Sequence, residues 1–152
     1  MEFLLLIVVV AVIAYFFLRR KTAGVQQVPI DHLPETFVVL DLETTGLDAS
    51  RHEIIEIAAI RYRKGTTTHE TLQALVKPSK KVPQKITEIT GITQEMLETN
   101  GEPLANVMRE FAVFMGEHRL VTFNAEFDMA FLHAATTRHG LPKLNNPVSC
   151  AL

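Results

Sequence analysis

The stretch that decides the fold of this 152-residue chain is Phe37-Val-Val-Leu-Asp-Leu-Glu-Thr-Thr-Gly46. Its apolar residues predict a buried β-strand, and its Thr-Thr-Gly end predicts a turn. Asp41 and Glu43 are separated by one residue, so they share one face of the strand. Two carboxylates this close repel each other unless a proton or a cation lies between them. The segment therefore predicts a divalent-metal site at the end of a strand.

A second acidic motif lies downstream. The apolar run Leu120-Val-Thr-Phe123 leads into Asn124-Ala-Glu-Phe-Asp128 and then into a helical pattern, so Asp128 lies where a strand is followed by a helix. Taken singly, the first motif would also suit a solvated strand end, and Asp128 would suit an acid placed by the helix dipole. Both motifs, in order within one short domain, favour a functional site.

Four segments resemble the DEDD family of 3′→5′ exonucleases, which includes the proofreading epsilon subunit of bacterial DNA polymerase III. The resemblance runs from about Glu35 to the C-terminus and implies a ribonuclease H-like α/β fold, a mixed sheet with flanking helices. The family's third motif, a His or Tyr and a later Asp on a C-terminal helix, does not occur before Leu152, so we expect a C-terminally truncated member. The matching segments are Asp41-Leu-Glu43-Thr-Thr-Gly, Glu53-Ile-Ile-Glu56-Ile-Ala-Ala, Ile89-Thr-Gly-Ile-Thr and Asn124-Ala-Glu-Phe-Asp128.

The resemblance implies two Mg²⁺ or Mn²⁺ ions and a nuclease that removes nucleotides from single-stranded 3′ ends. Asp41 would bridge the two ions, Glu43 would complete the site of the water-activating ion, and Asp128 would serve the second ion through water. These three acids are the expected catalytic and metal-binding residues. The missing third motif holds a further carboxylate and the general base, and loss of a general base alone costs roughly 10²–10⁴ in rate. We therefore expect this chain to be nearly inactive.

The family pattern also implies substrate contacts. Thr44 would lie at the terminal 3′-hydroxyl, Ile89 and Thr90 beside the last nucleotide, and Phe127 against its sugar or base. Asn124 would position the strand end. Ile89 and Phe127 would equally suit the hydrophobic core, and Thr90 departs from relatives that carry a His at this position.

The remaining pattern predicts three strands, a helix, a strand, a helix and a strand. In the second strand Glu56 lies among apolar neighbours, either as an ion-paired sheet residue or as support for the metal ligands. We assign Phe111, Phe114, Phe123 and Phe131 to the core. The expected strands are 36–41, 53–63 and 70–76, an antiparallel meander, followed by 120–123 and 147–152; the expected helices are a short one from about residue 82, then 103–117 and about 128–140.

The N-terminus predicts a membrane anchor. Residues 3–18 are uninterrupted apolar residues followed by Arg19-Arg20-Lys21, and such a run spans about 24 Å as a helix. A cleaved signal peptide would need a positive segment before the run, and a buried helix is the other alternative. We expect an anchor at 1–21, a linker at 22–34 and an exonuclease-like domain at 35–152, on the cytoplasmic face of the inner membrane with the N-terminus outside.

Charge and cysteine content limit how the chain can bind a polyanion and whether it can form a disulfide. Three of 15 Lys and Arg and one of 17 Asp and Glu precede Asp31, which leaves 12 cations and 16 acids in residues 31–152. No broad basic surface is expected, so metal ions and local contacts would hold a polyanion. Cys150 is the single cysteine, which excludes an internal disulfide. The alternative to an exonuclease is a non-catalytic membrane-tethered module that binds nucleic acid or protein; an anchor is awkward for a polymerase-associated proofreading subunit.

Overall fold

The computed structural model describes residues 32–151. The predicted anchor at 1–21 and most of the predicted linker at 22–34 lie outside these residues. Within the described part of the chain, no helix has the length and apolar character needed to cross a membrane. The division of the chain at residues 21 and 34 stays a prediction.

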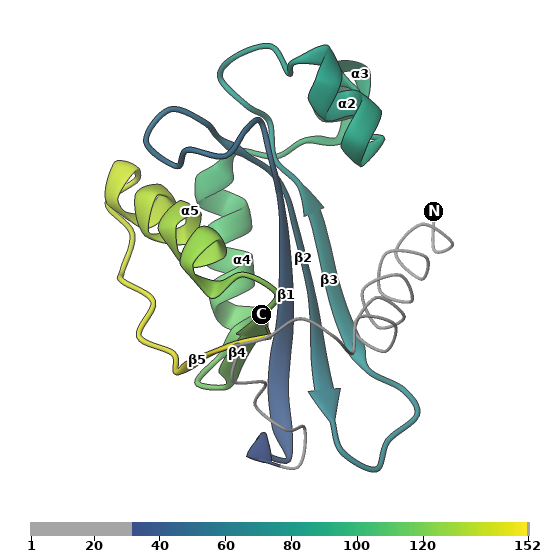
Figure 1. Ribbon diagram of the computed structural model, residues 1–152, viewed down its shortest axis with the longest axis vertical. Coiled ribbons are helices and arrows are strands. Elements are labelled where there is room, and N and C mark those ends of the chain that lie inside the picture. The colour runs from purple at the N-terminus through teal and green to yellow at the C-terminus, as the bar shows by residue number, and fades with distance from the viewer. Residues whose placement is uncertain (1–31, 152) are drawn as a thin grey trace, which may run out of the picture.

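A five-stranded mixed sheet forms the centre of the described domain. Its spatial order is β3-β2-β1-β4-β5 (Figure 1). The first three strands form the predicted antiparallel meander, and β4 and β5 run parallel to β1. The mixed α/β sheet predicted from the sequence is therefore confirmed. The strands are β1 Thr36–Thr44, β2 Ile54–Arg63, β3 Glu70–Leu75, β4 Arg119–Thr122 and β5 Val148–Cys150.

The helices lie in two groups. Helices α4 (Leu104–Met115) and α5 (Ala125–Arg138) cover the same face of the sheet, whereas α2 (Gln84–Thr90) and α3 (Gln94–Asn100) lie beyond the end of the sheet at which β1 finishes (Figure 1). The sequence predicted α2, α4 and α5 but not α3. The sequence signal for α3 is Thr93, a residue type typical of helix N-termini. Its side chain caps the helix by accepting a hydrogen bond from the Met96 amide at 3.1 Å.

The main core lies between the sheet and α4–α5. It contains Val38, Leu40 and Leu42 of β1 together with Phe111 of α4 and Leu132 of α5. These side chains follow the alternation of the strand and the spacing of the helices, so one face of each element is buried.

A second, smaller core fixes the region of α2 and α3. Ile55 of β2 packs there with Val82, Ile92 and Leu97. The strand that carries Ile57 into the main core thus also anchors the two short helices.

Three of the four phenylalanines assigned to the core pack there. Phe111 and Phe131 are buried, and Phe114 packs half-buried against the cluster. The assignment of Phe123 was wrong, because this side chain is 38 % exposed. It is the first residue after β4 and belongs to the turn that leads into α5, so the alternation of the strand no longer directs it inward.

The core makes a stability prediction. Phe111→Ala should lower the free energy of unfolding by about 3–5 kcal/mol, because the fully buried ring leaves a cavity beneath the sheet. Val113→Ala, on the same helix but 81 % exposed, is the matched control and should change it by less than about 0.5 kcal/mol. Urea unfolding followed by circular dichroism measures both; similar losses for the two variants would contradict the assigned core.

Candidate metal centre

Strand alternation places Asp41 and Glu43 on the face of β1 opposite to Leu40 and Leu42. The latter two point into the core under α4 and α5, whereas both acids are half-buried. β1 is the middle strand and is flanked by β2 and β4. The two carboxylates are therefore fixed within a paired sheet and not at a free edge.

Pairing of β1 with β2 adds a third acid. Glu43 lies directly opposite Glu56 in the antiparallel register, so their side chains share a face. Gln73 of β3 donates a hydrogen bond from Nε2 to Glu56 Oε1 at 2.8 Å. No ion pair of Glu56 occurs among residues 32–151, and its role in supporting the metal ligands stays a prediction.

Helix α5 supplies the fourth acid from its first turn. Thr122 Oγ1 donates a short hydrogen bond to Asp128 Oδ2, and both side chains are buried. Thr122 is paired with Leu40, the residue that precedes Asp41. Asp128 is thus held against the end of β4, next to the strand that carries Asp41.

Burial raises the pKa of all four acids, and the charge of Asp41 adds to the shift of the other three. Burial, then the charges of Asp41 and Glu56, raise the pKa of Glu43 to about 7. Burial, together with the charge of Asp41, raises the pKa of Asp128 to about 6 against the lowering effect of the Thr122 hydrogen bond. The pKa values of Asp41 and Glu56 are also raised, chiefly by burial, and the charge of Asp41 adds to the shift of Glu56. Asp41 is therefore the acid whose charge acts on each of the other three.

This charge suits a cation. Within the described range the ion pairs are Arg51–Asp48 and Arg61–Glu70, and neither involves these four acids. Carboxylate oxygens are the ligands that Mg²⁺ and Mn²⁺ prefer. As the side chains stand, no group of three His, Cys, Asp or Glu residues between 32 and 151 is arranged to hold a metal ion. The acids fit the chemistry of a divalent site, and their side chains would have to converge further to bind one.

Three of the residues predicted to bind substrate take part in local hydrogen bonds. Thr44 Oγ1 donates to the Gly46 carbonyl at 2.7 Å, at the end of β1. Thr90 Oγ1 donates to the Ile86 carbonyl at 2.9 Å in the last turn of α2. Asn124 caps α5 by accepting the Phe127 amide at 3.3 Å. Each side chain has a structural role that explains it without a substrate.

The apolar candidates differ from one another. Ile89 is 69 % exposed, so its alternative assignment to the core is wrong. Phe127 is half-buried and packs on Phe131 with ring centroids 4.9 Å apart, which agrees with a core role. Leu47, in the turn that follows β1, is 86 % exposed and was not predicted. Leu47 is notable only because it is exposed, and exposure cannot be read from a single leucine in the sequence.

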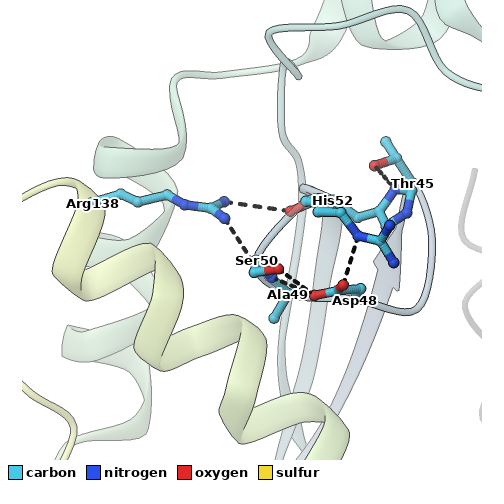
Figure 2. Close-up of polar contacts among 7 residues, drawn as sticks. Thr45, Asp48, Ala49, Ser50, His52 and Arg138 are labelled. Atoms are coloured by element: carbon cyan, nitrogen blue, oxygen red, sulfur yellow. Dashed lines mark hydrogen bonds and ion pairs between the residues drawn. The ribbon is translucent and has the colours of Figure 1, made fainter.

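The turn after β1 is held by polar contacts (Figure 2). Asp48 accepts hydrogen bonds from the Ser50 amide and hydroxyl at 2.9 and 2.6 Å and from Arg51 at 2.7 Å. Arg138, at the end of α5, donates to the carbonyls of Ala49 at 2.7 Å and His52 at 3.4 Å. Helix α5 thus contacts this turn at one end and places Asp128 at the other.

Gly46 lies against the ring of His52. A Cβ at position 46 would lie 2.5–2.6 Å from three ring atoms, closer than van der Waals contact allows. The same ring lies 3.4 Å from Thr45 Oγ1, which accepts the Glu53 amide at 3.0 Å. A side chain at position 46 would therefore force the His52 ring to move.

Comparison with known proteins agrees with this architecture. The family model RNase_T, described as Exonuclease, matches residues 38–150. The PolC-type DNA polymerase III of Bacillus cereus is 41 % identical over 114 residues, which cover 75 % of this chain and 8 % of the polymerase. The Thermotoga maritima PolC-type enzyme is 50 % identical over 97 residues, 64 % of this chain and 7 % of the polymerase. The chain thus spans less than a tenth of these relatives.

Solved structures share the fold. Exonuclease I without ligand has a TM-score of 0.69 at 21 % identity, and the match covers 78 % of this chain and 29 % of that protein. Escherichia coli exonuclease I in complex with a dA16 oligonucleotide has a TM-score of 0.67 at 20 % identity over 77 % of this chain and 28 % of that protein. The predicted ribonuclease H-like fold is confirmed for the described sheet and helices. The chain therefore belongs to the DEDD-type exonuclease family of nucleases.

Proposed function

We propose that this domain hydrolyses nucleotides from the 3′ ends of single-stranded nucleic acid, with Asp41, Glu43 and Asp128 as its divalent-metal ligands. The observation that carries the proposal is the position of these acids: Asp41 and Glu43 share one face of β1, and Asp128 is held against the end of β4, next to β1. The charge of Asp41 acts on Glu43 and on Asp128, although Asp128 comes from a distant part of the chain. Because the chain belongs to a nuclease family, phosphodiester hydrolysis is the reaction that we assign to these acids.

The residues around the acids would prepare the site. Thr122 orients one oxygen of Asp128, and Gln73 orients one oxygen of Glu56. Glu56 lies opposite Glu43, and its negative charge would help to attract a cation to Glu43. Two divalent ions would supply an activated water and neutralise charge on the phosphoryl and departing oxygens.

The end of β1 is suited to hold the terminal nucleotide. Thr44 closes the strand beside the acids, and Leu47 presents an exposed apolar side chain just beyond it. Ile89 presents a second one from α2. These two aliphatic side chains would make van der Waals contact with the base or sugar of the terminal nucleotide. We propose single-stranded DNA as the substrate, in line with the DNA polymerases among the relatives and the oligonucleotide bound to E. coli exonuclease I.

A second candidate is a binding module that keeps the fold without turnover. One observation favours it: no three His, Cys, Asp or Glu side chains among residues 32–151 are already gathered around a metal position. Attachment to the membrane by residues 1–21 stays a prediction for either candidate.

The nuclease proposal predicts metal-dependent, stepwise shortening of a 5′-labelled single strand, with Mn²⁺ or Mg²⁺ required. The assay uses a high protein concentration, so that slow turnover is also detected. Asp41→Asn should reduce the rate of shortening by at least about 10²-fold, because it removes the charge shared by the whole centre. Denaturing gels that resolve single nucleotides measure both.

Glu117→Gln serves as the control, because it removes an exposed charge beyond the end of α4. It should leave the rate unchanged. Equal loss in both variants, cleavage inside the strand, or full activity in EDTA would each contradict the proposal. Absence of any product, with oligonucleotide binding retained, would favour the binding module.

The raised pKa values predict a pH-dependent stability of the metal-free chain. Glu43 in the folded chain holds a proton up to about pH 7, above its ordinary pKa of 4.5, and Asp128 up to about pH 6. Their contribution to stability is complete below the ordinary values and is lost as pH rises through the folded ones. In EDTA, Tm should therefore fall between about pH 4.5 and pH 7, and Glu43→Gln should flatten the fall.

Added Mn²⁺ should reverse this trend, since a cation replaces the displaced protons. The rise in Tm on adding Mn²⁺ should be larger at high pH than at low pH and smaller in Glu43→Gln. Glu110→Gln, which removes an exposed acid on α4, is the control and should behave like the parent chain. A Tm rise that does not depend on pH or on Glu43 would count against metal binding by these acids.

A further inference from the structure

Residues 77–81, Lys-Pro-Ser-Lys-Lys, connect β3 to α2 and form a local basic segment, here called the lysine loop. With Lys85 of α2 it holds four of the 12 Lys and Arg residues in 31–152, and no acid occurs from 77 to 87. All four lysine side chains are exposed. The lysine loop is therefore positively charged, although the domain as a whole carries more acids than cations.

The lysine loop lies beside the acidic centre. Leu75, two residues before Lys77, is paired with Glu56. The Ser79 amide donates to both carboxylate oxygens of Glu53 at 3.1 and 3.2 Å. The Glu53 backbone in turn bonds to Thr45, two residues after Glu43. Figure 1 shows the β3–α2 connection passing over the same end of the sheet as the turn that follows β1.

The backbone of the lysine loop is fixed at both ends. The Val76 amide donates to the Ile55 carbonyl at 2.9 Å, just before the loop. Just after it, Val82 is buried in the second core, and its amide donates to Gln94 Oε1 at 3.0 Å. The lysines are therefore presented from a held backbone, which lowers the entropic cost of binding a ligand.

An open hollow of about 440 Å³ lies between the lysine loop and Gln94 and Glu98 of α3. Glu98 is the one acid in its lining, and its carboxylate accepts a hydrogen bond from Gln94 Nε2 at 2.9 Å. Lys77, Lys80 and Lys81 outnumber it. The hollow is thus suited to an anion with several charges.

We propose that the lysine loop binds the phosphates of the single strand upstream of the nucleotide held at the acidic centre. This rests on the proposed function and names the path of its substrate. A polyanion that approaches four carboxylates is repelled, so the strand needs a cationic surface close to, but separate from, the metal position. Lysine contacts to phosphate supply such binding without regard to base sequence.

The test compares two variants with the same net charge. Lys80→Gln/Lys81→Gln neutralises the lysine loop, and Arg109→Gln/Lys143→Gln neutralises two exposed cations on α4 and on the α5–β5 connection. Fluorescence anisotropy follows a labelled oligothymidylate of about a dozen nucleotides. Mg²⁺ is present, and phosphorothioate linkages at the 3′ end slow any cleavage.

The loop variant should raise Kd roughly tenfold at about 50 mM salt and reduce the slope of log affinity against log salt by about 1.4. The control variant should leave both quantities unchanged. Equal losses in the two variants, no loss in either, or no binding by the parent chain would overturn the proposal. If the lysine loop instead served an acidic protein segment, both variants would bind the strand like the parent.

The result is separable from the nuclease proposal. Parent chain that binds the strand through the lysine loop but never shortens it would contradict the proposed function and support this inference. If the parent chain shortens the strand and the loop variant has the same Kd and salt slope as the parent, the proposed function is supported and this inference is contradicted. Circular dichroism melting of both variants verifies that each is folded.

Discussion

The structure depends on the pairing of β1 on both sides. β2 and β4 hold this strand in place, and its alternation directs Leu40 and Leu42 into the core and Asp41 and Glu43 away from it. The same pairing sets Glu56 opposite Glu43 and places Thr122 next to Asp41. Burial within a sheet opposes the charged form of each acid, and their mutual repulsion adds to that. Ionisation of these acids therefore lowers the stability of the domain when no metal is bound.

Much of this fold could be predicted, because its elements follow from local patterns. Alternation in residues 37–44 and 54–63 and helical spacing around Phe111 are properties of short segments. Helices α2 and α3 both have seven residues, too few for a periodic pattern; α2 was predicted from Pro83 and Gly91 at its two ends, whereas the capping residue Thr93 of α3 was not recognised. Phe123 was misassigned because the end of β4 depends on the capping of α5 by Asn124, which an apolar run does not disclose.

Some features of the candidate site could likewise be predicted from the sequence, and others could not. Carboxylates at strand ends can be recognised from their spacing, and the family resemblance supplied an expected partner in Asp128. The influence of Asp41 on Glu56 could not be predicted, since it depends on a register between two strands. Exposure of Leu47 and Ile89, and the place of the basic segment beside the centre, depend likewise on how the sheet meets α2 and α3. Tertiary arrangement, not composition, decides these features.

The contact between Gly46 and His52 couples two positions that are six residues apart in the chain. A larger residue at 46 would force the imidazole to turn away from its position beside Thr45. A smaller side chain at 52 would remove this contact and leave room for a Cβ at 46. The effect of a substitution at 46 therefore depends on which residue occupies position 52.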